Sequence, residues 1–210
     1  MLENIEWTRV WRERVNESFP RVLIIGDSIM DGSKLHISRE LSDCAAVSVL
    51  VTSKALDNPY YWQELSLLLE QEGATYTVIY FNNGLHTGGM TPKEYAAQYR
   101  STILRLREAV PDATLILGLS KPVAKPVASP AAADAPITPI MQYTDADRTV
   151  RAFNAAVSAL GKEWHLPVFD AYACVDGNAA CRTLDGYHYT EDGYLHLSRS
   201  IAKTIRPYLP

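Results

Sequence analysis

Short apolar runs rich in β-branched residues alternate along the chain with segments of helical periodicity. The runs are Val22 to Ile25, Val47 to Val51, Val78 to Phe81, Leu115 to Leu119 and Val168 to Phe169. Because they are apolar on both faces, they are typical of parallel strands that helices cover on each side. The pattern predicts an α/β fold with about five parallel strands, and the length of 210 residues suits a single domain over residues 1–210.

Three helices are predicted from capping residues followed by apolar stripes. The clearest has Thr91 as its N-cap, with Pro92 in the first helical position and Glu94 completing a capping box. A second begins near residues 144–145, and a third begins near Thr190. The expected buried stripes are Tyr95, Tyr99, Ile103, Leu106 and Val110 in the first helix, Val150, Phe153, Val157 and Leu160 in the second, and Leu197, Ile201 and Ile205 in the third.

Two segments allow alternative interpretations. The stretch from Pro122 to Pro139 is rich in proline and alanine, so we expect a long loop that does not pair in a sheet. It follows the fourth predicted strand and would lie at the carboxyl edge of the sheet, either covering a substrate or as a plain surface loop. The aromatic run Tyr60 to Trp62 is either a platform for stacking on a sugar or the start of a docked helix, and the helical spacing of the leucines after it favours the helix.

Charge and composition narrow the classes of partner. The formal net charge is −4, and the basic residues are scattered among acidic ones, so nucleic acid is a poor partner. No apolar run approaches the roughly 20 residues that span a bilayer, so we expect a soluble protein. It would be cytoplasmic if Met1 is native, and secreted or periplasmic if a signal peptide was removed. The sequence leaves the oligomeric state open.

The cysteines and isolated histidines indicate no metal site. Three cysteines are too few for a disulfide framework, so free thiols are expected, although Cys174 and Cys181 could close one small loop. The histidines at 36, 165 and 196 lack partners at metal-ligand spacing and are interpreted as structural or surface residues. We therefore expect no metal and no cofactor.

A candidate nucleophile follows the first predicted strand. The strand runs directly into Gly26, Asp27 and Ser28. A glycine permits a sharp turn, and a serine between a strand and a helix start exposes its hydroxyl where backbone N–H groups can meet an oxyanion. Asp27 could order the turn by accepting bonds from nearby amides. The alternative is that Asp27 and Ser28 only cap the next helix.

A candidate acid and base lie near the other end of the chain. Asp185 and His188 are separated by two residues, so one turn can bring the carboxylate to Nδ1 of the ring while Nε2 faces elsewhere. That arrangement fits the acid and base of a catalytic triad. The alternative is a surface loop that leads into the last helix.

A third candidate segment follows the third predicted strand. It contains Asn82, Asn83, Gly84 and His86. A side-chain amide at the carboxyl end of a strand could complete an oxyanion hole, whereas the Asn-Gly pair is equally a turn signal. His86 either touches substrate or is an ordinary loop histidine, and the second interpretation is favoured.

These three segments, in this order from Val22 to about Tyr194, resemble the sequence blocks of the SGNH/GDSL hydrolase family. The resemblance implies a three-layer α/β/α, flavodoxin-like fold with Ser28 as nucleophile and Asp185 and His188 completing the triad. It further implies that Asn83 is the oxyanion asparagine, with Asn82 as the alternate. The family's third oxyanion donor is a glycine N–H after the second strand; the segment VTSKAL has no glycine, so Ser53 or a neighbour would supply it.

The chain also departs from the family pattern. Ile29 stands where the family name has leucine, Phe81 replaces the glycine before the oxyanion asparagine, and Gly84 stands where an aspartate often follows it. These departures leave the triad intact and bear on the subfamily and its substrate.

The function hypothesis is ester hydrolysis in two steps through an acyl-enzyme, without a cofactor, on a small-molecule or glycan ester. Short acyl groups are preferred, such as O-acetyl on a carbohydrate, because the chain lacks a long apolar lid or a membrane-surface helix. The alternatives are an acylhydrolase of the lysophospholipase or thioesterase type, and a glycan-binding module that keeps the fold without catalysis.

Overall fold

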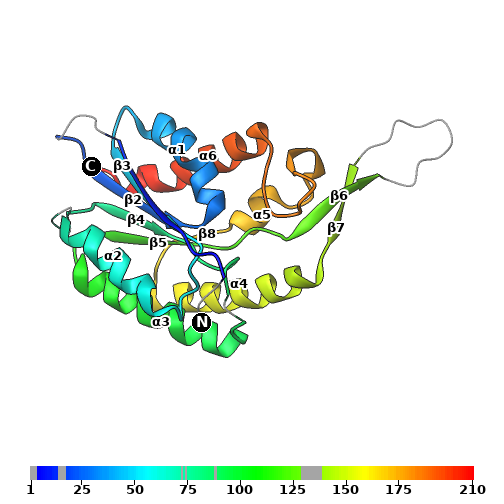
Figure 1. Ribbon diagram of the computed structural model, residues 1–210. Coiled ribbons are helices and arrows are strands. Elements are labelled where there is room, and N and C mark those ends of the chain that lie inside the picture. The colour runs from blue at the N-terminus through cyan, green and yellow to red at the C-terminus, as the bar shows by residue number, and fades with distance from the viewer. Residues whose placement is uncertain (1–3, 14–17, 72, 74, 88, 129–138) are drawn as a thin grey trace.

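Figure 1 shows the computed structural model, which describes residues 4–13, 18–71, 73, 75–87, 89–128 and 139–210. Its main sheet, as far as these residues show it, has the strand order β1-β3-β2-β4-β5-β8. The strands are β1 (Thr8–Arg12), β2 (Arg21–Gly26), β3 (Ala46–Thr52), β4 (Val78–Phe81), β5 (Thr114–Gly118) and β8 (Val168–Phe169). β1 runs antiparallel to β3, and the other five strands are parallel. The five predicted strands and the α/β class are confirmed.

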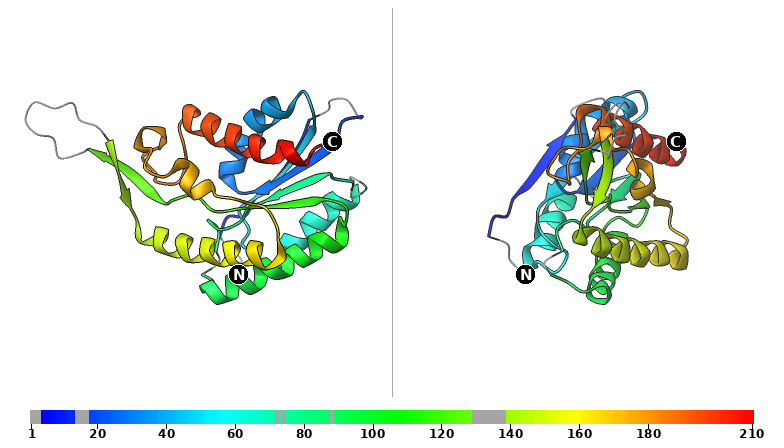
Figure 2. Two further views of the ribbon diagram at one scale, coloured as in Figure 1. Left: turned by 180° about the vertical axis from the view of Figure 1, so that it is seen from behind. Right: turned by 90° about the vertical axis from the view of Figure 1, so that its right-hand side faces the viewer.

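The helices cover both faces of the sheet, which gives three layers (Figures 1 and 2). One face carries α1 (Ser28–Leu41), α5 (Ala171–Val175) and α6 (Glu191–Ile205), and the other carries α2 (Pro59–Gln71), α3 (Pro92–Ala109) and α4 (Asp145–Trp164). Two short 3₁₀ helices, η1 (Ala179–Cys181) and η2 (Arg206–Tyr208), flank α6 in the sequence. Within the described part of the chain, no helix has the length and apolar character needed to cross a membrane.

The predicted capping residues and apolar stripes agree with the observed start of α3 and with the buried faces of α3, α4 and α6. At the start of α3, the Thr91 N–H donates to Glu94 Oε2 at 2.8 Å and the Glu94 N–H donates to Thr91 Oγ1 at 3.3 Å. Every residue of the three expected stripes is buried. The aromatic run after Asn58 begins α2, with Tyr61 buried on the sheet, as the helical interpretation predicts.

The expectation of an unpaired stretch between Pro122 and Pro139 is wrong. β6 (Ala124–Ala128) pairs antiparallel with β7 (Pro139–Tyr143) in a separate two-stranded ribbon that extends beyond the end of the main sheet (Figure 1). Proline is tolerated there because each strand of such a ribbon is an edge strand, where a missing N–H can face solvent. Residues 129–138 lie outside the described residues, so the substrate-covering alternative stays a prediction.

The edge strand β1 is absent from the sequence prediction. Only Val10 and Trp11 of its five residues are apolar, and none of the five is buried, so β1 lacks the continuous apolar signal of the inner strands. Thr8 lies opposite Thr52 in the register with β3, which brings the preceding Trp7 beside the carboxyl end of that strand. This placement bears on the predicted role of Ser53.

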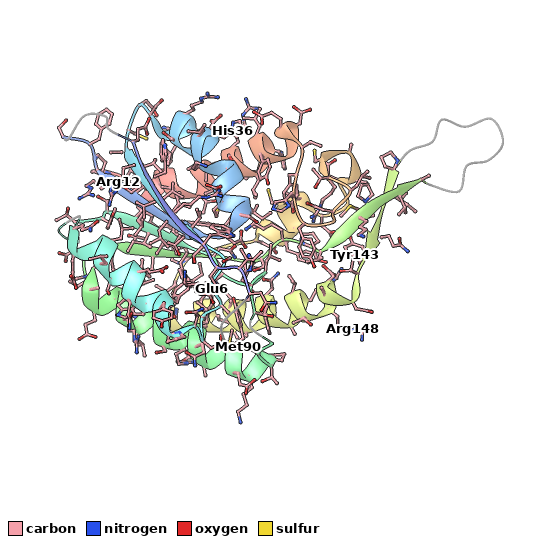
Figure 3. The ribbon with its side chains drawn as sticks, viewed as in Figure 1. Glu6, Arg12, His36, Met90, Tyr143 and Arg148 are labelled. Atoms are coloured by element: carbon pink, nitrogen blue, oxygen red, sulfur yellow. The ribbon has the colours of Figure 1, made fainter. Side chains whose placement is uncertain are left out.

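The three isolated histidines contact other parts of the fold or end a helix, and the cysteines are unpaired. His36 on α1 lies 3.1 Å from Glu191 Oε1 at the start of α6, where α1 and α6 pack together (Figure 3). His165 ends α4 in the left-handed conformation at φ 53°, and His196 Nε2 lies 3.0 Å from the Cys174 carbonyl oxygen. All three cysteines are free thiols, as expected, including Cys174 and Cys181. Among the described residues, no group of three or more His, Cys, Asp or Glu side chains could hold a metal ion.

Candidate active site

Ser28 lies at the junction between β2 and α1, at the carboxyl edge of the parallel sheet. Asp27 is the N-cap of α1, and its Oδ1 accepts from the Ile29 N–H at 2.9 Å, so it orders this turn as the sequence predicts. Gly26 is required for the close approach of strand and helix, because a Cβ there would lie 2.8 Å from Met30 Cβ. Ser28 is the first residue of α1, where backbone N–H groups have no partner within the helix.

Asp185 and His188 lie in a tight loop between η1 and α6. An isolated antiparallel bridge between Arg182 and Tyr189 closes the loop at its base, and the Thr183 N–H donates to the His188 carbonyl at 3.1 Å. Gly186 turns the chain at φ 83°, a left-handed conformation that favours glycine. The short Asp-x-x-His spacing therefore folds back on itself and brings the carboxylate to the ring.

The structure brings the Ser28 turn and the Asp185–His188 loop together, although Ser28 and His188 are 160 residues apart in the sequence. His188 Nε2 lies 2.9 Å from Ser28 Oγ, and His188 Nδ1 lies 2.6 Å from Asp185 Oδ2. Both distances are within hydrogen-bond range. The three side chains thus have the relative geometry of nucleophile, base and acid in a serine triad.

Hydrogen bonds fix the charge of Asp185 and the proton position on His188. Desolvation favours the neutral acid, but the backbone N–H and ring of His188, the Tyr187 N–H and the Thr183 hydroxyl outweigh it and hold the pKa of Asp185 well below its usual range. An ionised carboxylate only accepts, so Nδ1 of His188 carries the hydrogen. Nε2 is then free to accept the Ser28 proton.

The side chains of the two asparagines after β4 have different hydrogen-bond partners. Asn82 Nδ2 donates to the Gly118 carbonyl at 2.9 Å and lies 3.3 Å from Ser120 Oγ, so both of its amide hydrogens have partners. Asn83 Nδ2 donates to the Lys54 carbonyl at 3.1 Å, and the same side chain interacts with the buried hydroxyl of Tyr61, where it opposes the rise in pKa that burial causes. Both asparagines are thus held from neighbouring segments, and the oxyanion role of Asn83, with Asn82 as the alternate, stays a prediction.

Ser53 does not fit the predicted role of third oxyanion donor. Its N–H donates to the Trp7 carbonyl at 3.1 Å, and its Oγ accepts from the Trp7 N–H at 3.0 Å. The next N–H, of Lys54, donates to Thr52 Oγ1 at 3.1 Å. Trp7, the residue just before the overlooked edge strand β1, thus engages the N–H group of Ser53. His86 is partly buried in the loop after β4, and its contact with substrate stays a prediction.

Two buried cations under the site were missed by the sequence analysis. Lys121, which follows β5, is 1% exposed and donates from Nζ to Asn82 Oδ1 at 2.8 Å. Arg182 is 4% exposed; it donates to the Pro122 carbonyl and, at 3.4 Å, to the Gly186 carbonyl in the Asp–His loop. The sequence offered only a weak signal for Lys121, which stands three residues after the end of β5, because lysine in a loop after a strand is usually exposed.

A serine, a histidine and an aspartate in this hydrogen-bonded geometry are typical of serine hydrolases. The model of the GDSL-like lipase/acylhydrolase family matches residues 58–201, about two thirds of the chain. The protein belongs to this family and is a hydrolase that acts on ester bonds. The matched segment includes Asn83, Asp185 and His188, and Ser28 precedes it. No curated protein matches the sequence.

Solved structures that share this fold include one lipase-like protein and two acetylesterases. A GDSL-like lipase from Bacteroides thetaiotaomicron has 18% identity and a TM-score of 0.64, with 94% of this chain and 93% of that chain covered. A carbohydrate acetylesterase from Sinorhizobium meliloti has 16% identity and a TM-score of 0.63, covering 90% and 99%. A catalytic mutant of an acetylxylan esterase from Geobacillus stearothermophilus has 16% identity and a TM-score of 0.63, covering 92% and 96%. At these identities the likeness concerns the fold.

Proposed function

We propose that the protein removes short acyl groups, in particular O-acetyl groups, from carbohydrates by serine catalysis. Ser28 Oγ attacks the ester carbonyl carbon while His188 Nε2 takes its proton, and Asp185 stabilises the imidazolium. Collapse of the tetrahedral intermediate releases the sugar alcohol, which receives that proton from His188. Water then attacks the acyl-enzyme with His188 again as base and releases acetate. The observation that carries this proposal is the chain of contacts from Ser28 through His188 to Asp185.

The exposure of the site supports a large leaving group and a small acyl group. The side chains of His188 and Asp185 are 40% and 49% exposed, so a bulky polymer can reach them. Leu184 and Tyr187 are exposed beside them in the same loop and offer an apolar and an aromatic surface to a sugar ring. Two of the structures that share the fold are described as a carbohydrate acetylesterase and an acetylxylan esterase, which agrees with this choice of substrate class.

We expect hydrolysis of p-nitrophenyl esters to fall steeply as the acyl chain lengthens. An open site offers a short acyl group enough contact, but it cannot bury the additional methylenes of a long chain, each worth about 0.8 kcal/mol when fully buried. The measurement is kcat/KM across acetyl, butyryl, octanoyl and palmitoyl esters, followed by acetate release from acetylated and chemically deacetylated xylan. A preference for octanoyl or longer esters would favour the lysophospholipase or thioesterase alternative.

A phosphonate probe separates an enzyme from a glycan-binding module on the same fold. Such a probe labels a serine only where a base activates it. Intact-mass measurement after reaction should show one adduct per chain on the wild type and none on Ser28→Ala. An unlabelled wild type that still binds xylan would support the binding module.

Asn83→Ala is expected to lower kcat by about 10²- to 10³-fold, the usual cost of losing one oxyanion donor. The remaining donors, including the Ser28 N–H, still act. Asn82→Ala removes a buried amide that holds the floor, so it should also lower stability, measured as the thermal unfolding midpoint. A normal kcat in a correctly folded Asn83→Ala would contradict the assignment of this side chain to the oxyanion.

A further inference from the structure

The strongest feature outside the triad is the buried ammonium of Lys121. Its side chain is among the largest fully buried ones, although lysine is almost never buried without a partner. Among the described residues, its Nζ donates a hydrogen bond to Asn82 Oδ1 at 2.8 Å. Desolvating an ammonium is costly, so its retention under the site calls for a role that an apolar side chain of the same size would not supply.

Lys121 completes a rigid frame around Asn82. The Asn82 amide is held by the Gly118 carbonyl and the Ser120 hydroxyl on one side and by Lys121 on the other. Ser120 is fixed in turn, because its backbone N–H and C=O each bond to the Asn154 side chain of α4 at 2.7 Å. All of these groups are buried. The frame therefore determines where the next residue, Asn83, presents its amide.

The same ammonium also interacts electrostatically with Asp27, in the turn that carries Ser28. Burial lowers the pKa of Lys121, the Asp27 carboxylate raises it, and Arg182 lowers it. Asp27 is 1% exposed, and among the described residues its Oδ2 has no hydrogen-bond partner. A buried carboxylate in that state is costly unless a cation compensates it through space. Asp27 thus links Lys121 to the nucleophile turn, and Asn82 links it to the oxyanion loop.

We propose that Lys121 is a positioning residue for ester hydrolysis: it lies under the site, holds the Asn82–Asn83 loop through Asn82 Oδ1, and balances the Asp27 carboxylate beneath Ser28, which fixes the distance between nucleophile and oxyanion donor. It touches no substrate atom. This inference rests on the proposed function. A misplacement of about 1 Å in such a pair can cost about 10²-fold in rate, which sets the expected size of the effect.

The test compares Lys121→Met with the wild type on p-nitrophenyl acetate. Methionine keeps an apolar stem of similar shape and removes both the donor and the charge. Rates are expressed per active site, counted by phosphonate labelling, so that misfolded chains do not contribute. We expect kcat to fall at least about tenfold while KM changes less than about threefold, because the loss falls on geometry needed in the transition state. A smaller fall in kcat would overturn the proposal. Lys203→Met, an exposed lysine on α6, is the matched control and should match the wild type.

A double-mutant cycle distinguishes positioning from general structural support. If Lys121 acts through the placement of Asn83, then Lys121→Met should cost at most a third as many fold in an Asn83→Ala background as in the wild type. A larger residual cost would show that it acts by another route and would overturn the proposal. If Lys121→Met yields no labelled enzyme, Lys121→Gln, which retains a donor, is judged by the same limits. Failure of both variants to give labelled enzyme would mean a purely structural role and would also overturn it.

The same assays separate this inference from the proposed function. Wild type and Ser28→Ala are run beside the Lys121 variants. A wild type without Ser28-dependent ester hydrolysis overturns the function. An active wild type with an unimpaired Lys121→Met overturns only the positioning role.

Discussion

Ser28→Ala should lower kcat for acetyl ester hydrolysis by roughly 10⁴- to 10⁶-fold, as loss of the nucleophile does in other serine hydrolases. Alanine removes the oxygen that His188 Nε2 faces at 2.9 Å and leaves the oxyanion donors and the binding surface in place. Those remaining groups account for the small residual rate over water. The measurement is the initial rate on p-nitrophenyl acetate at matched protein concentration.

The folded state of Ser28→Ala should be close to that of the wild type. The N-cap of α1 is Asp27, so the substitution leaves the helix cap intact and introduces alanine, a good helix former, at the first helical position. The thermal unfolding midpoint should therefore shift by only a few degrees. Activity within about tenfold of the wild type would contradict the assignment of Ser28, because loss of a true nucleophile costs several orders of magnitude in rate.

The parts of the fold that could be predicted are those with local signals. Inner parallel strands are apolar on both faces, and the cap at Thr91 satisfies its own helix end, so both are visible in a short window of sequence. β1 was missed because an edge strand has only one neighbour and an ordinary surface composition. The β6–β7 ribbon was not predicted because proline is excluded only from the interior of a sheet. A two-stranded ribbon consists of two edge strands, where proline is tolerated.

The candidate site divides in the same way. The candidate triad lies in two short motifs. Ser28 follows the Gly26-Asp27 turn, and Asp185 and His188 are only three positions apart, so both motifs and their order along the chain can be recognised in the sequence. The floor of the site depends on contacts between distant segments: Lys121 is 39 residues from Asn82 in the sequence, and no local pattern connects the two. The Ser53 N–H has a distant partner for a related reason, since Trp7, 46 residues earlier and just before β1, accepts its hydrogen bond.

Asp185→Asn should lower kcat by about 10⁴-fold while the geometry of the loop is retained. An asparagine amide can donate to Nδ1 of His188, which moves the ring hydrogen to Nε2 and leaves nothing to accept the Ser28 proton. The measurement is kcat/KM for the acetyl ester, with Asp112→Asn, an exposed turn residue, as the matched control. A rate within about tenfold of the wild type would mean that His188 is oriented by the backbone alone, and the triad assignment of Asp185 would fail.

The pH dependence of stability tests the same carboxylate independently of turnover. The pKa of Asp185 is depressed in the folded state, so its ionised form stabilises the fold above the unfolded value of about 3.9, and this contribution disappears as the pH falls through the lower folded value. Asp185→Asn should therefore have a lower free energy of unfolding than the wild type at pH 7, and the difference should shrink below about pH 4. Because the side chain is 49% exposed, solvent screening keeps the difference small. Urea unfolding at pH 7 and pH 3 measures it, and a difference that stays constant or grows towards acid would show that the bonds from His188, Tyr187 and Thr183 do not hold the charge of Asp185.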